Sequence, residues 1–339
     1  MSEIIHDLIC IGRSSIDLYS NDIGSSFEEI NSFAAYVGGC PTNISVGTQR
    51  LGLRSALLTG VGEDPVGEFI IHFLNREKVN TQYIARKKDK RSSAVILGIE
   101  PPDKFPLVYY RDNCADIAID VEDVGKIPFG NCRAILISGT GFSKEPSRSA
   151  TLYAVEEAVA QGVKVILDVD FRVDQWVDLQ TFGITLRSVL PLVDIIIGTT
   201  EEIKAAAWRG KGNAQIKDSQ VNESKIEGDE TEAVQHLLEI GGEILVLKAG
   251  TKGCYLYHKN QNKAEHVPGY PVEVQNTLGA GDAFASGFIY GLLKNWDFYK
   301  SARLGNACGA IVVTRHGCAN FMPSMKEVEA FVEDKGGLT

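Results

Sequence analysis

The sequence predicts an α/β fold in which a mainly parallel central sheet is covered by helices on both faces. Short apolar runs rich in β-branched residues recur along the chain, and a turn and a helical pattern follow each run. The runs are almost continuously apolar, which is typical of strands buried on both faces. The 339 residues could form one large domain or two, and we expect a single domain over residues 1–339.

The elements follow in a regular order. "DLICIG" (residues 7–12) is predicted as the first strand, and "PTNISVGTQRLG" (41–52) as a helix that ends at a glycine. "SALLTGVG" (55–62) is the next strand, and Pro65 opens a helix over residues 65–77. Four later strands are expected at residues 133–139, 163–170, 194–198 and 243–250. Ligands of such sheets bind at the carboxyl ends of the strands.

Two regions depart from this alternation. Segments within about residues 13–40 and 92–120 contain predicted strands without helices between them. We expect them to form a small β sheet that acts as a lid and excludes water from the site. Residues 209–232 are polar and lack apolar periodicity, so they are predicted to be an exposed, mobile insertion of no assigned function.

Composition limits the classes of function. The net charge is −10 and the longest basic cluster is "RKKDKR" (residues 86–91), so we expect no nucleic-acid partner. No apolar run approaches membrane-spanning length and the start lacks a signal pattern, so we expect a cytoplasmic protein without a membrane partner. Seven scattered cysteines without a CxxC pair indicate reduced, buried thiols rather than disulfides or structural zinc.

The stretch "NTLGAGDAFASGF" (residues 276–288) is the strongest candidate for chemistry. Gly279, Ala280 and Gly281 leave backbone N–H groups uncovered where a helix is expected to begin, and such groups can hold an anion. Asp282 follows directly. Either it caps the helix and the glycines serve packing, or it accepts a proton from a hydroxyl that attacks a phosphoryl group held by the N–H groups.

Two common nucleotide motifs are missing from the sequence. Neither Gly125-Lys126 nor Gly210-Lys211 is followed by Ser or Thr, so the chain has no GxxxxGK[ST] loop. The first predicted strand leads into "RSSIDLY" rather than GxGxxG, which disfavours a nicotinamide-dependent dehydrogenase.

Five segments, in order, resemble the ribokinase-like (phosphofructokinase B type) carbohydrate kinases. They are "GGCPTN" (38–43), "GEDPVG" (62–67), "VLKAGTKG" (246–253), "NTLGAGD" (276–282) and "GNACGAIVVTRHGCANFMP" (305–323). The resemblance implies a ribokinase-like three-layer sandwich with a small β lid. It also implies transfer of a phosphoryl group from ATP, with Mg²⁺, to a sugar.

The resemblance also implies roles for single residues. Asp282 would be the catalytic base, and Gly279, Ala280 and Gly281 the anion hole. Residues expected to hold sugar hydroxyls are Asp17, Gly38, Gly39 and Asn43. Read alone, Asp17 is equally consistent with a turn and Asn43 with a helix cap.

The nucleotide side is implied in the same way. Residues expected to border the nucleotide are Lys248, Gly250 and Gly253, with Asn306 near the adenine or ribose. Glu202 would organise magnesium, although Thr199 stands where the family has Asn. Asn276 replaces an Asp that in many members helps to hold a monovalent cation, so dependence on such a cation stays open.

Arg172, Arg111 and Tyr109 indicate an acidic sugar, because guanidinium matches a carboxylate in bidentate geometry. The alternative for Arg172 is a salt bridge to a neighbouring Asp. "FPLVYYR", "DVDFR", "NTLGAGDAF" and "RHGCANFMP" resemble family members that phosphorylate the terminal hydroxyl of 5-dehydro-2-deoxy-D-gluconate in myo-inositol catabolism.

Alternatives within the family are a 2-keto-3-deoxygluconate kinase and a fructokinase. Outside enzymes, the chain could be a kinase-fold protein that senses a sugar acid. Lids of this family often pair, so a homodimer through the lid is expected.

Overall fold

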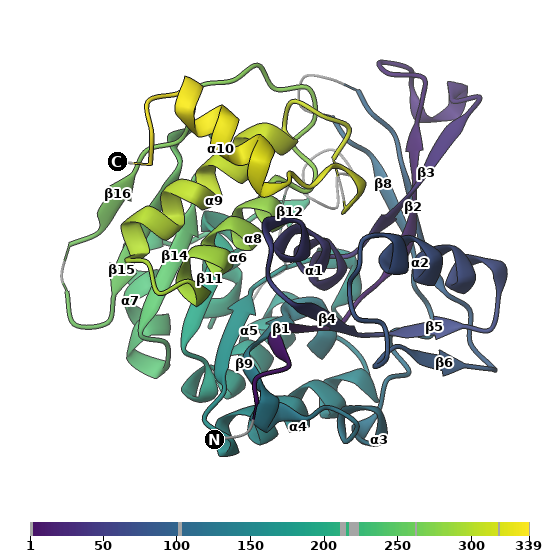
Figure 1. The fold of residues 1–339 in the computed structure, drawn as a ribbon, viewed down its shortest axis with the longest axis horizontal. Helices are drawn as coiled ribbons and strands as arrows, with labels where there is room; N and C mark the ends of the chain where they lie inside the picture. The colour runs from purple at the N-terminus through teal and green to yellow at the C-terminus, as the bar shows by residue number, and fades with distance from the viewer. Residues whose placement is uncertain are drawn as a thin grey trace.

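The central sheet has eight strands in the order β16-β15-β14-β11-β10-β9-β1-β4 (Figure 1). The computed structural model describes residues 3–100, 104–210, 215–216, 224–261, 263–317 and 319–338. The strands are β1 (His6–Ile11), β4 (Ser55–Leu58), β9 (Cys132–Ser138), β10 (Lys164–Asp168), β11 (Ile195–Thr199), β14 (Ile244–Lys248), β15 (Cys254–His258) and β16 (Glu265–Val267). Strands β4 to β14 of this order pair in parallel, and β15 and β16 add an antiparallel edge. This arrangement confirms the predicted mainly parallel sheet.

Helices cover both faces of the sheet. Successive strand residues point to opposite sides, and because both sides are apolar, each must be covered. In β1, Leu8 and Cys10 belong to one apolar core, and Ile9 and Ile11 to the other. The first core contains α1 (Cys40–Leu51), α2 (Pro65–Arg76), α8 (Ala280–Leu293), α9 (Phe298–Val312) and α10 (Met325–Asp334). The second contains α3 (Val121–Val124), α4 (Ser147–Ala160), α5 (Leu179–Val189), α6 (Thr200–Ala207) and α7 (Glu230–Ile240). The result is the three-layer sandwich that the sequence predicts.

A second sheet projects from the body beside α2 (Figure 1). Its order is β3-β2-β7-β8, with β2 (Ser15–Ser20), β3 (Phe33–Gly38), β7 (Ser93–Leu97) and β8 (Leu107–Tyr110). These strands fall in the two regions where the sequence predicts lid strands. The sheet has an apolar cluster of its own, against which Leu278 of the body packs. A short parallel pair, β5 (Gly60–Gly62) and β6 (Ala85–Lys87), lies below α2.

The polar stretch after α6 contains a short antiparallel pair, β12 (Gln215–Ile216) and β13 (Ser224–Lys225). Residues 211–214 and 217–223 of the predicted insertion lie outside the described residues. Its predicted end at residue 232 is too late, because α7 begins at Glu230. Asp229 caps that helix by accepting a hydrogen bond from the backbone N–H of Glu232, so these polar residues open a helix.

The cysteines follow the sequence-based expectation where they are described. Six of them are free and buried, and Cys318 lies outside the described residues. Within the described ranges, no helix is both long and apolar enough to cross a membrane.

Candidate active site

The start of α8 has an unusual cap. Its N-cap residue is Gly279 at φ 76°, in the left-handed region that glycine adopts without strain. No side chain caps this end, so Asp282 is not the helix cap that the packing alternative requires. A Cβ added to Gly281 would lie 3.2 Å from Nζ of Lys248. The N–H groups of this turn therefore lie next to an ammonium group.

Asp282 meets α1 instead. Asn43, in the first turn of α1, donates from Nδ2 to Oδ2 of Asp282 at 2.7 Å. Burial raises the pKa of Asp282, whereas the Asn43 hydrogen bond opposes the rise. Gly39 precedes α1 at φ 107°, and a Cβ there would lie 2.5 Å from the carbonyl oxygen of Arg13. Only glycine permits this close approach of the two loops.

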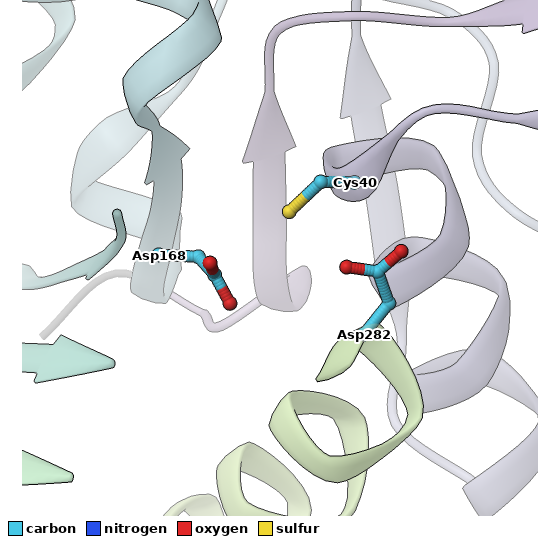
Figure 2. A group of neighbouring side chains, drawn as sticks. All are labelled: Cys40, Asp168 and Asp282. Atoms are coloured by element: carbon cyan, nitrogen blue, oxygen red, sulfur yellow. The ribbon is translucent and has the colours of Figure 1, made fainter. Parts of the chain in front are cut away.

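Asp168 ends β10 and faces the same space. Figure 2 shows its side chain, Cys40 of α1 and Asp282 of α8 turned toward one another, with one ligand atom of each within 4.8 Å of the others. Burial and the nearby carboxylates raise the pKa of Asp168 to about 7, against the opposing charge of Lys248. Burial also raises the pKa of the Cys40 thiol, so the protonated thiol is a poor metal ligand.

A cavity of about 290 Å³ opens at this edge of the sheet. It is lined by Phe105, Asp168, Asp170, Arg172, Thr199, Glu202, Lys248, Thr277, Leu278, Gly279, Gly281 and Asp282. Phe105 and Leu278 also belong to the lid's apolar cluster or pack against it. The cavity therefore combines the ends of parallel strands, the start of α8 and the base of the lid.

Two predicted sugar-binding residues depend on each other. Asp17 of β2 accepts a hydrogen bond from Ser15 Oγ at 2.7 Å. Gly38 lies at the end of β3, where a Cβ would lie 1.9 Å from Oδ2 of Asp17. Glycine at position 38 thus makes room for the Asp17 carboxylate.

The predicted arginines differ in their surroundings. Arg172 pairs with Asp170 at 3.1 Å, which is the salt bridge considered as its alternative role. It also lines the cavity, and its buried Nε has no hydrogen-bond partner among the described residues. The geometry is therefore compatible with both roles.

Arg111 is enclosed. Its Nε donates to Asp116 at 2.6 Å, and its Nη1 donates to Gln175 at 3.1 Å. The side chains of Arg111 and Asp116 are 2% and 0% exposed. The predicted substrate contact is not supported for Arg111, because these partners occupy its guanidinium.

Of the four residues predicted to border the nucleotide, two lie at a groove and two do not. Gly250 and Lys248 line an open groove of about 510 Å³ together with Thr199, Tyr255 and Tyr257.

Two other predicted nucleotide contacts serve packing. A Cβ at Gly253 would lie 2.2 Å from the carbonyl oxygen of Val267. Asn306 is buried, and its Nδ2 donates to the carbonyls of Val267 and Pro268. Gly253 and Asn306 therefore shape the loop after β16, and neither residue is among those that line the groove.

Glu202 keeps a place in the cavity although Thr199 stands before it. Thr199 and Glu202 form a reciprocal capping box at the start of α6. The Glu202 carboxylate lies 3.7 Å from Nζ of Lys248, which also lies 3.3 Å from Asp168. Carboxylate oxygens are the donors that Mg²⁺ prefers, so the donor set around Glu202 fits that ion.

Asn276 anchors the turn before α8. Its Nδ2 donates to the carbonyl of His316 at 2.6 Å, and its Oδ1 accepts from the backbone N–H of Leu278 at 3.0 Å. The neutral amide thus satisfies two backbone groups of neighbouring loops.

Comparison with known proteins identifies the family. The family model described as pfkB family carbohydrate kinase matches residues 5–325. The chain belongs to this family of carbohydrate kinases. A Bacillus subtilis (strain 168) protein named 5-dehydro-2-deoxygluconokinase is 32% identical over 328 residues, which cover 96% of this chain and 96% of the relative. A protein of the same name from Clostridium botulinum (strain Alaska E43 / Type E3) is 32% identical, with 97% and 93% covered.

Solved structures of two fructokinases share the fold. Fructokinase from Vibrio cholerae O395, in its fructose-, ADP- and calcium-bound form, aligns with a TM-score of 0.79 at 23% identity, covering 96% of this chain and 99% of that one. Fructokinase from Xylella fastidiosa with bound ATP aligns with a TM-score of 0.80 at 21% identity, covering 96% and 98%. The ribokinase-like fold is confirmed.

Sequence reasoning missed two charged residues of this kinase-family site. Asp168 is the last residue of β10, and Arg13 follows β1 by two positions. Both lie at the carboxyl ends of predicted strands, where ligands were expected to bind. This position in the sequence could have identified them as candidates. Their contacts depend on segments far away in the chain, which no local pattern records.

Proposed function

We propose that this carbohydrate kinase transfers the γ-phosphoryl group of ATP to the terminal hydroxyl of 5-dehydro-2-deoxy-D-gluconate. The observation that carries the proposal is the half-buried Asp282 carboxylate, held by Asn43 at 2.7 Å beside the uncapped start of α8. The cavity at this point also contains Arg172. A base, an anion-binding turn and a guanidinium in one cavity suit phosphorylation of a sugar acid.

The reaction needs one proton acceptor and one anion site. Asp282 accepts the proton of the terminal hydroxyl as its oxygen forms a bond to the γ-phosphorus, and the bond from that phosphorus to the β–γ bridging oxygen breaks. ADP leaves with the electron pair of the broken bond. The N–H groups of Gly279, Ala280 and Gly281 stabilise charge on the transferring group. The raised pKa of Asp282 makes it a stronger base than an exposed aspartate.

The sugar and nucleotide would approach from different sides. Asp17 and Asn43 would fix the hydroxyls of the sugar, and Arg172 its carboxylate. ATP would lie along the groove at Gly250, with Lys248 near its phosphates. Glu202 would hold Mg²⁺ through its carboxylate, and the ion would supply charge neutralisation to the phosphates.

The lid would close over the sugar and exclude water. Its solvent side supports pairing between two chains, because Phe33, Val108 and Tyr110 are 37%, 43% and 57% exposed. We therefore propose a homodimer through the lid, in a cytoplasmic enzyme of myo-inositol catabolism.

The test is ADP release from ATP and Mg²⁺ with four sugars: 5-dehydro-2-deoxygluconate, 2-keto-3-deoxygluconate, fructose and ribose. A kcat/KM highest for the first supports the proposal. Preference for the second or third sugar would assign a 2-keto-3-deoxygluconate kinase or a fructokinase instead. Saturable sugar-acid binding without ADP release would indicate a sensing protein.

A further inference from the structure

Among the described residues, Arg13 is the cation of the site that makes no direct ion pair. Lys248 is paired with Asp168, and Arg172 with Asp170. No carboxylate of the described residues lies within 4.0 Å of the Arg13 guanidinium, although Arg13 is only 6% exposed. Burial lowers the pKa of Arg13, and the charges of Tyr109, Asp170 and Asp17 more than offset this, so its pKa is raised. None of these groups forms a direct ion pair with it, and this arrangement leaves room for an anion brought by a ligand.

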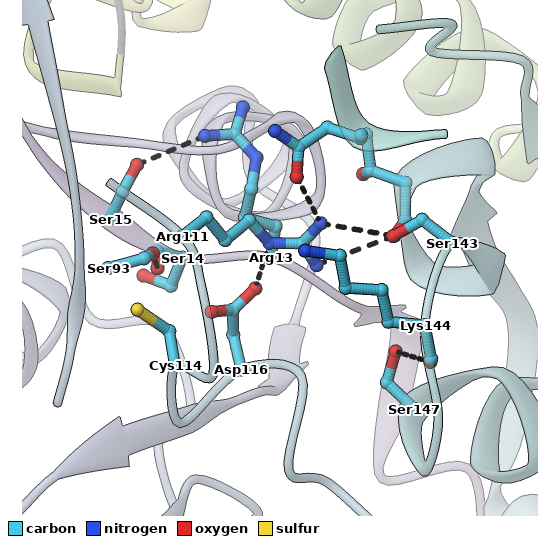
Figure 3. A network of polar contacts seen from close by, with 12 residues as sticks. Arg13, Ser14, Ser15, Ser93, Arg111, Cys114, Asp116, Ser143, Lys144 and Ser147 are labelled. Carbon is cyan, nitrogen blue, oxygen red and sulfur yellow. Dashed lines mark hydrogen bonds and ion pairs between the residues drawn. The ribbon is translucent and has the colours of Figure 1, made fainter. Parts of the chain in front are cut away.

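The hydrogen bonds of Arg13 are also incomplete. Its Nη1 donates to Ser15 Oγ at a long 3.3 Å, and its buried Nε has no partner among the described residues. Figure 3 shows the contrast with Arg111, which several contacts hold in place. Of the two arginines near the lid base, Arg13 therefore retains donors for a ligand.

Arg13 lies beside the predicted sugar-binding residues. Ser15, which accepts from Arg13, donates to Asp17 at 2.7 Å. The carbonyl of Arg13 accepts from Thr42 at 2.9 Å, and it approaches Gly39 closely. Backbone and side chain thus fix Arg13 next to the loop that begins α1.

Tyr109 joins Arg13 to Arg172. The Arg13 guanidinium carbon lies 5.1 Å from the centre of the Tyr109 ring. Burial raises the pKa of Tyr109, and the charges of Arg172 and Arg13 both oppose that rise. Both guanidinium groups are therefore close to one phenol.

We propose that Arg13, seated on Tyr109, binds the carboxylate of the sugar acid and sets the preference for acidic over neutral sugars. This inference rests on the proposed function and adds a residue to its substrate site. A bidentate guanidinium–carboxylate pair would give Arg13 a direct ion pair and a partner for its Nε. A neutral sugar would supply no such ion pair.

The test compares Arg13→Gln, Arg13→Lys and the unchanged protein. We expect Arg13→Gln to lower the ratio of kcat/KM for 5-dehydro-2-deoxygluconate to that for fructose by about 30-fold or more, within the range of charge-assisted hydrogen bonds. Arg13→Lys should restore part of that ratio, and the KM for ATP should not change. Arg54→Gln is the matched control, because Arg54 is an exposed arginine that is paired with Asp7.

A binding measurement keeps the inference independent of turnover. Gluconate and sorbitol share a carbon skeleton and differ in the carboxylate, so the thermal shift caused by gluconate should exceed that of sorbitol and should disappear in Arg13→Gln. The melting temperature of the unliganded Arg13→Gln variant should change little, since Arg13 makes no direct ion pair and only one long side-chain hydrogen bond. A merely structural arginine would instead lower it.

The outcomes separate the two proposals. Turnover of sugar acids with an unchanged acid-to-neutral ratio in Arg13→Gln overturns the inference and leaves the kinase assignment standing. Gluconate binding that depends on Arg13, without phosphorylation of any sugar acid, overturns the proposed function and supports the inference.

Discussion

Gly38→Ala tests the sugar site through the position of the Asp17 carboxylate, for which Gly38 makes room. The new Cβ would lie 1.9 Å from Oδ2 of Asp17, and real Cβ atoms essentially never lie within 3.0 Å of another group, so something must shift. The carboxylate must therefore move by more than about 1 Å (3.0 − 1.9 = 1.1 Å). A displacement of this size costs about 100-fold in rate, or about 2.7 kcal/mol of transition-state stabilisation. We expect kcat/KM for the sugar acid to fall by that factor.

The assay is ADP release at varied sugar-acid concentration, with Gly125→Ala as the control. Gly125 has φ −59°, and the nearest atom to an added Cβ lies 3.5 Å away, so this variant should keep full activity. In an Asp17→Ala background the obstructing carboxylate is gone. Adding Gly38→Ala should then lower kcat/KM for the sugar acid by less than about twofold. Full additivity of the two substitutions, or an unchanged kcat/KM in folded Gly38→Ala, would refute the reasoning.

Three further predictions follow from the charged groups of the cavity. Asp282→Asn should keep the melting temperature and lower kcat by about 10²–10⁴-fold; a near-normal turnover would remove Asp282 as the base. Arg172→Ala should raise the KM for the sugar acid at least tenfold more than the KM for ATP, and equal changes would indicate a structural arginine. The raised pKa of Asp168, about 7, means that the folded state holds a proton that the unfolded state releases near pH 4. The free energy of unfolding that this proton contributes is fully present below about pH 4 and is lost as pH rises through 7. Between pH 5.5 and 8.5 the free energy of unfolding of the unchanged protein should fall by about 2 kcal/mol relative to that of Asp168→Asn. The fall accrues over the about 1.5 pH units between pH 5.5 and the folded-state pKa, at about 1.36 kcal/mol each. Urea unfolding at both pH values measures this, and a constant difference would contradict it.

The sequence predicted the elements that depend on local pattern. Continuous apolar runs identified the parallel strands, and the small residues before Asp282 located the start of α8. Arg111 was misjudged because its partner Asp116 and its acceptor Gln175, 64 positions away, meet it only in the folded chain. Arg13 was missed because its surroundings, which include Tyr109, are assembled from segments far apart in the chain. No window of sequence contains that information.

The hydrogen bond from Asn43 to Asp282 joins residues 239 positions apart. During synthesis on the ribosome, the β1–α1 region leaves the exit tunnel long before α8 is translated, and domains acquire their contacts as the chain emerges. Asn43 and Asp282 therefore cannot meet until α8 has formed and docked against α1. We therefore expect the candidate site to be completed late in the synthesis of each chain, and a chain that ends before α8 to lack carbohydrate kinase activity.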